Sequence, residues 1–549
     1  MVGTRTSAHV WTTVRPARRV AAIVHNITAA TRLFDVLHLL ADSRVQVEFT
    51  VPGSSAFTAG TEEFLTGQGI RVHPWQSIVD NPPDLAISAS LGGDLSALRP
   101  LLVLPHGMGY NKYLRETGNG KRETGNGKRE TGNGKRETGN GHEGAFGISS
   151  ESLLNANGDL IPTVLVLSHE EQRTRLARSC RQAVPISLVA GDPCLDRMTA
   201  SLPLRPMYRR AFGVAPGQRL LVVSSTWGPG SLFAECPDLP DTLAELPLDE
   251  YRTVVALHPN IRAWHSDWQV AAWLARCTRA GLTILPAQDG WRAALIAADT
   301  IIGDHGSVTF YGAALGRPVF LATAPHSTVD PDSPIAQLLH IAPRYTGDPT
   351  APCPDLTSVT ALATSHPDKA APLLRTEFYR LLNLPEPTYP PEVQVVPTPL
   401  VPPTTPAAQL IHVTLHNNTA AITRHASTNL NSGAYNGTHL TVDTTASPLR
   451  RELELAEILI APDPTTAQEL LHSLPGALLA TTPLPHDRWL TLSRHNTHYV
   501  TTGLPTSHGP LGASLLHHLL SDHTPPTVPL TLTIHCGPRR FTATIQPAD

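Results

Sequence analysis

The stretch Asp304-His305-Gly306-Ser307 places a carboxylate, an imidazole and a hydroxyl in one turn, directly after an apolar run and before a helix-forming one. Gly306 lets the backbone approach a ligand closely. Ser307 belongs to the residue types that cap helices. The free N–H groups of a first helical turn, together with the helix dipole, attract phosphate. Taken alone, the turn is better explained as an ordinary capped connection between a strand and a helix.

Three other predicted strands end in residues suited to the same chemistry. Ser225 and Thr226 close an apolar strand with a turn that offers hydroxyl and N–H donors. His258 follows the next strand, and the pair His106-Gly107 follows a strand nearer the N-terminus. Because ligands of parallel α/β sheets bind outside the carboxyl ends of the strands, we expect these loops to face one cleft.

The elements that must position these loops alternate along the chain from residue 18. Apolar strands such as "RVAAIVHNI" and "DLAISAS" are separated by amphipathic helices such as "AATRLFDVLHLLAD". This alternation is typical of βαβ units with a parallel sheet covered on both faces. The pattern restarts near residue 204. The sequence therefore predicts an α/β protein with two doubly wound, Rossmann-type domains, 18–200 and 204–384, and a cleft between them.

The C-terminal part has a different composition. Residues 385–406 hold nine prolines, which indicates an extended linker of polyproline character. Residues 407–549 mix strand-like and helical segments, and we expect a small α+β domain there. This domain is rich in histidine, but no convincing tetrahedral set of ligands appears, so no metal site is predicted.

A tandem repeat interrupts the first predicted domain. The heptad RETGNGK occurs four times over 115–141, and the last copy ends in His142. It carries no apolar residue and cannot form a coiled coil or a buried element, so we expect a mobile insert. One interpretation is a basic lid for an anionic substrate, since each unit adds one positive charge. The other is a duplication tolerated in a surface loop.

Composition excludes several classes of protein. The net charge is −4 and no long basic run appears, so a nucleic-acid partner is not expected. The six cysteines form no C-x-x-C pair, which argues against a zinc ribbon or a disulfide framework and fits a reducing compartment. No stretch approaches the roughly eighteen apolar residues that span a bilayer. We expect a cytoplasmic protein that could lie peripherally on the inner face of the membrane.

Together these motifs resemble the GT-B glycosyltransferases, and most closely the CDP-glycerol glycerophosphotransferase family, which polymerises teichoic-acid-like chains. The matching motifs are "HG" at 106–107, "GDPCLD" at 191–196, "STW" at 225–227, "LHP" at 257–259 and "GDHGSVTFYGAALGRPV" at 303–319. The resemblance implies a transferase without metal or cofactor. It would move a glycosyl or glycerophosphoryl group from a nucleotide-activated donor to a polyol or glycan acceptor, in cell-envelope polymer synthesis.

The resemblance also implies roles for individual residues. His106 would act as, or beside, the base on the acceptor hydroxyl, and a histidine suits that task near neutral pH. His258 would be the second catalytic residue and would help to hold the donor. The implied phosphate-binding set is Asp304, His305, Gly306, Ser307, Ser225 and Thr226. The implied acceptor-side set is Gly107, Asn111 and Lys112.

Two alternatives remain open from the sequence. The family's usual Asp-Tyr-Ser-Ser turn is Asp-His-Gly-Ser here, and Cys194 replaces a usual arginine. The turn and "LHPN" also resemble the non-hydrolysing UDP-N-acetylglucosamine 2-epimerases, although their Gly-Thr-Arg-Pro motif after the first strand is replaced by "VHNIT". A catalytically silent nucleotide-sugar-binding or scaffold protein is the other alternative.

Overall fold

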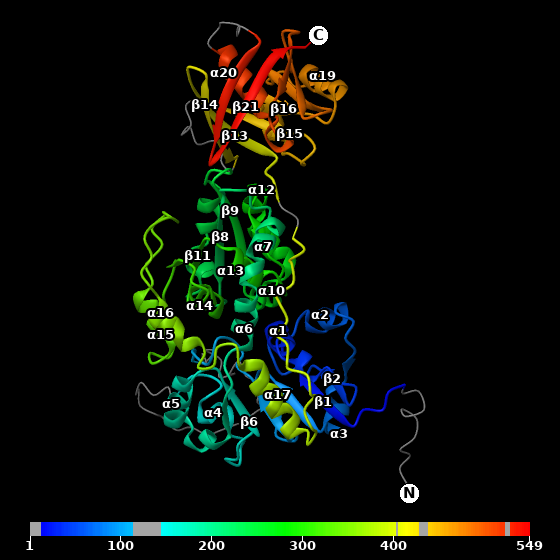
Figure 1. Ribbon diagram of the computed structural model, residues 1–549, viewed down its shortest axis with the longest axis vertical. Coiled ribbons are helices and arrows are strands. Elements are labelled where there is room, and N and C mark those ends of the chain that lie inside the picture. The colour runs from blue at the N-terminus through cyan, green and yellow to red at the C-terminus, as the bar shows by residue number, and fades with distance from the viewer. Residues whose placement is uncertain (1–12, 114–143, 402–403, 428–436, 522–527, 549) are drawn as a thin grey trace, which may run out of the picture.

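The computed structural model describes residues 13–113, 144–401, 404–427, 437–521 and 528–548. The insert predicted to be mobile, 115–141, lies outside these residues. The described chain forms three units that follow one another along the long axis of the molecule (Figure 1). Among the described residues, no helix combines the length and the apolar character needed to cross a membrane.

The N-terminal unit is built on a seven-stranded parallel sheet with the strand order β3-β2-β1-β4-β5-β6-β7. Its strands are β1 (Arg18–Ile23), β2 (Val45–Thr50), β3 (Val72–His73), β4 (Leu85–Ser88), β5 (Leu101–Val103), β6 (Val164–Leu167) and β7 (Ser187–Val189). Its helices are α1 (Ile27–Phe34), α2 (Thr61–Gly67), α3 (Trp75–Asp80), α4 (Ser150–Leu153), α5 (Glu170–Ser179) and α6 (Pro193–Ala200). Apolar side chains cover both faces of the sheet, which explains the continuous apolar runs of its strands.

The second unit repeats this design on a five-stranded parallel sheet with the order β10-β9-β8-β11-β12. Its strands are β8 (Arg219–Ser225), β9 (Tyr251–Leu257), β10 (Thr283–Ile284), β11 (Thr300–Gly303) and β12 (Val319–Leu321). Its helices are α7 (Arg205–Ala211), α8 (Leu232–Glu235), α9 (Leu239–Ala244), α10 (Pro259–His265), α11 (Asp267–Trp273), α12 (Ala275–Arg279), α13 (Trp291–Ala297), α14 (Ser307–Ala314), α15 (Pro334–Ile341) and α16 (Thr357–Thr360). The two parallel sheets confirm the predicted α/β class.

The chain crosses back to the first unit after α16. Helix α17 (Ala370–Leu381), which the sequence analysis placed in the second domain, packs on the N-terminal sheet. Its Leu374 and Phe378 are fully buried in the same core as Leu33 of α1. An apolar stripe on a helix can be buried against any unit within reach, so its periodicity does not reveal the destination.

The described residues of the proline-rich segment, 385–401 and 404–406, contain no helix or strand, and the segment runs along both units (Figure 1). Val396 is buried, and its carbonyl accepts a hydrogen bond from the Tyr208 hydroxyl at 2.5 Å. Arg197 donates to the carbonyls of Gln394 and Val395. The segment is therefore a strap fastened to the protein surface rather than a free spacer.

The C-terminal unit is a closed barrel with the strand order β13-β14-β20-β21-β19-β18-β17-β16-β15. Its strands are β13 (Ala408–His416), β14 (Thr419–Ala426), β15 (Thr438–Asp443), β16 (Ile458–Ile460), β17 (Leu479–Leu484), β18 (Arg488–Ser493), β19 (His498–Thr502), β20 (Leu530–Cys536) and β21 (Arg539–Pro547). Three helices accompany it, α18 (Arg450–Leu455), α19 (Pro464–Ser473) and α20 (Leu511–Ser521). Strands and helices are mixed as expected, but the closure into a barrel was not predicted.

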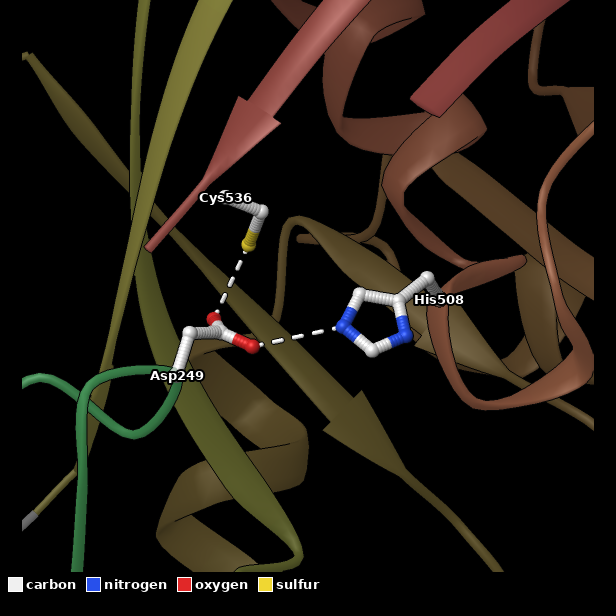
Figure 2. A group of neighbouring side chains, drawn as sticks. All are labelled: Asp249, His508 and Cys536. Carbon is white, nitrogen blue, oxygen red and sulfur yellow. Dashed lines mark hydrogen bonds and ion pairs between the residues drawn. The ribbon is translucent and has the colours of Figure 1, made fainter. Parts of the chain in front are cut away.

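A buried carboxylate lies at the centre of one group of contacts between the barrel and the second unit (Figure 2). Asp249, just before β9, is 1% exposed and accepts hydrogen bonds from both Arg424 and Arg539 of the barrel. His508 Nε2 lies 3.3 Å from one of its oxygens, and the Cys536 thiol donates to the other at 2.9 Å. Burial alone would raise the pKa of Asp249, but the hydrogen bonds from Arg424, His508 and Cys536 and the charge of Arg424 hold it well below its usual range.

Among the described residues, Asp249, His508 and Cys536 form a group whose potential metal-ligating atoms all lie within 4.8 Å of one another. The donor set suits a hydrogen-bond network better than a metal ion. Two guanidinium groups already neutralise the carboxylate, and burial raises the pKa of the Cys536 thiol to about 12, so no thiolate is available.

Asp249→Asn should weaken the attachment of the barrel. The substitution leaves two guanidinium groups without their counter-ion, and breaking a buried ion pair typically costs about 3–5 kcal/mol. Calorimetry should show a separate, lower melting transition. The matched control is Glu454→Gln, which removes the exposed pair with Arg450 and should cost less than about 1 kcal/mol. An unchanged single transition in the Asp249 variant would show that other contacts hold the barrel.

Candidate active site

A cleft containing a cavity of about 390 Å³ lies between the carboxyl ends of the two parallel sheets. Strand-end loops of both units line it, as expected from the sequence. The predicted site residues that line it are His106, Gly107, Asn111, Lys112, Ser225, Thr226, His258, His305, Gly306 and Ser307. The remaining predicted residue, Asp304, lies behind this lining.

Asp304 joins two turns of the second unit and is fully buried. Its carboxylate accepts hydrogen bonds from the N–H groups of Thr226 at 2.8 Å, Leu232 at 2.8 Å and Gly306 at 2.9 Å. Burial raises the pKa of Asp304, while the three N–H donors oppose this shift. With its oxygens engaged in this way, Asp304 positions the phosphate-binding turn and offers no contact to a ligand.

The N-terminus of α14 opens onto the cleft. Its N-cap is Gly306, so the sequence-based expectation that Ser307 caps this helix is not met. The Ser307 hydroxyl instead accepts a hydrogen bond from the Met108 N–H of the first unit at 3.2 Å. Ser307 and Val308 line the cleft, and their N–H groups donate to no other residue of the described chain. Open N–H donors at the positive end of a helix dipole are favourable neighbours for an anion.

Gly107 brings the two units into contact at this point. A Cβ atom on Gly107 would lie only 2.6 Å from the Ser307 hydroxyl oxygen, so a side chain there would force that hydroxyl to rotate out of its contact with the first unit. The same loop continues to Lys112, whose ammonium group donates to the Thr226 hydroxyl across the cleft at 3.1 Å.

His106 is half-buried in the cleft, and its hydrogen bond defines its tautomer. Its Nδ1 lies 3.3 Å from the Ala89 carbonyl, which can only accept, so Nδ1 carries the proton and Nε2 is unprotonated. Burial, reinforced by the charge of Arg32, lowers the pKa of His106 to about 4. The ring is therefore neutral near pH 7, with one nitrogen able to accept a proton.

His258 has the opposite tautomer. Its Nδ1 accepts a hydrogen bond from the Asn260 N–H at 3.1 Å and caps α10, so the proton lies on Nε2. Burial, with Lys112 and His106 nearby, lowers the pKa of His258 well below its usual value. A neutral imidazole with Nε2–H donates hydrogen bonds, which suits contact with a phosphate oxygen better than proton abstraction.

The other predicted residues play unequal parts. The Ser225 hydroxyl donates to the Thr226 carbonyl and accepts from the Phe233 N–H, so it stabilises its own turn. Asn111 donates from Nδ2 to the Met108 carbonyl, while its buried Oδ1 has no partner among the described residues. His305 is buried beside the α14 N-terminus and also lines the cleft.

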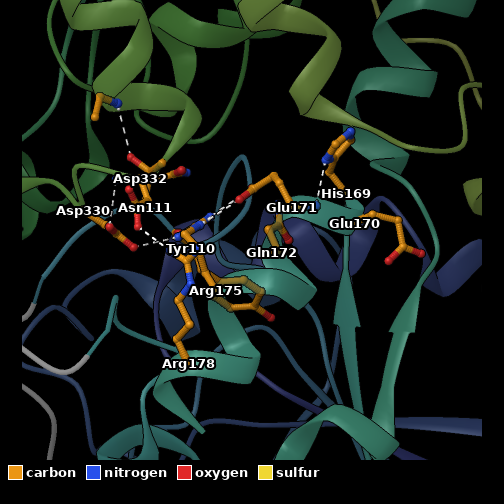
Figure 3. Close-up of polar contacts among 12 residues, drawn as sticks. Tyr110, Asn111, His169, Glu170, Glu171, Gln172, Arg175, Arg178, Asp330 and Asp332 are labelled. Carbon is orange, nitrogen blue, oxygen red and sulfur yellow. Dashed lines mark hydrogen bonds and ion pairs between the residues drawn. The ribbon is translucent and has the colours of Figure 1, made fainter. Parts of the chain in front are cut away.

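Ion pairs and a hydrogen bond fasten the region around the loop after β5 to the second unit (Figure 3). Buried Arg175 of α5 pairs with Asp330 at 3.1 Å and with Glu171 at 2.7 Å. The Asp330 N–H donates to the Asn111 carbonyl at 2.9 Å. The exposed pair Arg178–Asp332 lies beside them at 2.8 Å. The loop that carries His106 is thus held by both units.

The sequence analysis missed Arg32 of α1, which also lines the cleft. Among the described lining residues there are two cations, Arg32 and Lys112, and three histidines, but no aspartate or glutamate. A charged residue in a surface helix ordinarily faces solvent, which is why Arg32 was passed over. The available signal was its position in the helix that directly follows the carboxyl end of β1, where ligands of such sheets bind.

No protein-family model matches this sequence, and no curated protein matches it. Several solved structures, in contrast, are similar to this chain. The wall teichoic acid polymerase TagF is 10% identical with a TM-score of 0.38, over 68% of this chain and 84% of that chain. The UDP-GlcNAc 2-epimerase of Methanocaldococcus jannaschii is 10% identical with a TM-score of 0.39, over 66% of this chain and 99% of that chain.

The corresponding epimerase of Neisseria meningitidis is 10% identical with a TM-score of 0.36, over 66% of this chain and all (100%) of that chain. The chain is thus similar to members of both families that its motifs resemble, and the resemblance drawn from the sequence is confirmed. At such identities and TM-scores the likeness says nothing about the reaction, which we derive from the cleft.

His106 should titrate far below an ordinary histidine. By NMR, with the signal assigned from a His106→Gln variant, its ring should stay neutral down to about pH 5 and protonate near pH 4. The unfolded chain binds the proton at about 6.5, so His106→Gln should gain stability relative to the parent as the pH falls from that value to about 4. A titration midpoint near 6.5 would contradict the assigned environment.

Proposed function

We propose that this chain is a metal-independent, GT-B-type transferase. It moves a glycosyl or glycerophosphoryl group from a nucleotide-activated donor to an acceptor hydroxyl. One observation carries the proposal: the described lining of the interdomain cleft holds two cations, three histidines and an open helix N-terminus, but no carboxylate. Without a carboxylate the cleft offers a poor ligand set for Mg²⁺, while it suits a phosphorylated substrate.

The donor's phosphates are assigned to the second unit. The N–H groups of Ser307 and Val308, at the N-terminus of α14, would donate hydrogen bonds to the phosphates. His258 would donate one more from its Nε2–H. Lys112 approaches the same turn from the first unit through Thr226. As the bond to the leaving phosphate breaks, negative charge grows on that phosphate, and preorganised donors stabilise it. No cofactor is needed for this step.

The acceptor is assigned to the His106 side of the cleft. Its oxygen attacks the transferred group, and its proton passes to Nε2 of His106, the nitrogen that the Ala89 contact leaves unprotonated. A glycosyl transfer breaks the bond between the anomeric carbon of the sugar and the oxygen of the donor phosphate, and it releases a nucleoside diphosphate. A glycerophosphoryl transfer breaks the bond between the two phosphates and releases a nucleoside monophosphate.

The acceptor class is a polyol or glycan, consistent with the polar groups of Asn111 and Lys112 near His106. We assign the reaction to cell-envelope polymer synthesis, in the cytoplasm or at the inner face of the membrane. In that setting a membrane-bound acceptor would draw the protein to the bilayer surface. Donors to test first are nucleoside-diphosphate sugars and CDP-glycerol.

Nucleotide binding can be tested by thermal shift. A CDP-, UDP-, GDP- or dTDP-linked compound at a hundred times its dissociation constant should add about 2.7 kcal/mol of stability. The corresponding nucleosides, which lack phosphate, should add much less at the same concentration. If none of these compounds stabilises the protein, the proposed function is wrong. Stabilisation without any group transfer would instead favour a silent nucleotide-binding protein.

His258→Asn separates donor binding from folding. Asparagine is a good helix N-cap, so it should preserve the start of α10. The variant loses the Nε2–H donor, and a hydrogen bond to a charged group is worth about 1.5–3 kcal/mol, so affinity for the nucleotide should fall about tenfold to a hundredfold. Calorimetric titration measures this loss. Unchanged affinity with an unchanged melting temperature would remove His258 from the donor site.

A further inference from the structure

Arg32 lies on α1 of the first unit and reaches across to two aromatic rings of the second. Its guanidinium carbon lies 5.7 Å from the Trp291 ring centre and 5.3 Å from the Tyr311 ring centre. The residue is 8% exposed, and it lines the cleft. A buried cation is costly unless paired groups and hydrogen bonds replace its water.

The guanidinium of Arg32 donates no hydrogen bond to any group of the described chain, and its buried Nε has no partner there. The nearest carboxylate, Asp35, is 3.7 Å from Nη1. Both oxygens of Asp35 are already engaged, one with Arg292 at 2.7 Å and the other with Arg197 at 3.0 Å. The aromatic rings provide only cation–π contact.

The charges around Arg32 do not balance. Asp192, the other carboxylate that acts on Arg32, accepts from the Tyr311 hydroxyl at 2.7 Å and from the N–H groups of Cys194 and Leu195. Three guanidinium groups therefore face two carboxylates, which leaves one positive charge in excess. Arg32 shares Asp35 with two other guanidinium groups and is the most distant of the three. A buried cation with only a shared, distant counter-ion can accept a further anion beside it.

We propose that Arg32 binds an anionic phosphate of the ligand, and that it forms with the α14 N-terminus a two-point site for a diphosphate. This inference rests on the proposed function and identifies the diphosphate as the recognised group. A planar guanidinium fork matches the oxygens of a phosphate.

The placement of the two anion contacts supports a diphosphate over a monophosphate. The charge of Arg32 acts on His106, whose pKa it lowers, and Lys112 acts on the same ring. On the other side, the Ser307 hydroxyl lies against Gly107. The charge of Arg32 and the N-terminus of α14 thus both act at the His106-Gly107 pair, and a group with two adjacent charges can engage both.

Binding of the diphosphate has a consequence for the base. Arg32 and Lys112 both lower the pKa of His106 in the free protein. A bound anion offsets these charges, so the pKa of His106 rises from about 4 when the ligand binds. His106 would then be a stronger base in the complex than in the free protein, which favours catalysis only when the donor is present.

The experiment compares Arg32→Gln with Arg292→Gln. Calorimetric titration measures the affinity of each variant for inorganic pyrophosphate, inorganic phosphate, UDP and CDP. Thermal melting without ligand measures its stability. The proposal predicts that Arg32→Gln melts close to the parent temperature, since the guanidinium makes only a long ion pair and cation–π contacts. It also predicts a loss of at least about tenfold in pyrophosphate and nucleoside diphosphate affinity, with a smaller loss for phosphate. Arg292→Gln should melt lower, because it breaks the pair with Asp35.

Arg32→Lys, which keeps the charge and lacks the fork, should bind diphosphates with intermediate affinity. If the parent binds diphosphates and Arg32→Gln binds them equally well, the role of Arg32 is wrong while the proposed function stands. A lower melting temperature with unchanged affinity would identify Arg32 as a cation–π clamp between the units and would also overturn the inference. If the parent binds neither pyrophosphate nor any nucleoside diphosphate, both proposals fail.

Discussion

Positive charge in the interdomain cleft is not neutralised by any carboxylate among the described residues that line it. This excess of positive charge is local. Asp35 and Asp304 lie close by, but the oxygens of Asp35 bind Arg292 and Arg197, and those of Asp304 accept hydrogen bonds from backbone N–H groups. A low-dielectric cleft lined by two cations, Arg32 and Lys112, and by open N–H groups favours an anion over water. The tautomers of His106 and His258 add one proton acceptor and one donor at the same place.

The rest of the molecule keeps this arrangement in position. The turn that presents Ser307 is tied by Asp304 to the end of β8, and the loop that carries His106 is tied to the second unit by Arg175 and Lys112. Helix α17 and the proline-rich strap bind the units together on other surfaces. The barrel lies at the opposite end of the second unit, where Asp249 contacts it, and none of its described residues lines the cleft (Figure 1).

Local sequence patterns were sufficient to predict the two parallel sheets and most of the cleft. Strands such as β6 and β8 are continuous apolar runs, and polar residues that follow such strands must gather at one edge of a sheet. The features that were missed depend on contacts between residues far apart in the chain. Arg32 acquires its role only from Trp291 and Tyr311, and α17 from the sheet it covers. The barrel closes through pairing of β14 with β20, which no local pattern encodes.

The central claim is that the cleft is a diphosphate site. The most direct measurement is a crystal structure of the protein with a bound nucleoside diphosphate. The account predicts one phosphate within hydrogen-bonding distance of the Ser307 and Val308 N–H groups and of His258 Nε2, and the other phosphate at the guanidinium of Arg32. A nucleotide bound outside the cleft, or one whose phosphates face solvent while its base occupies the α14 N-terminus, would contradict it.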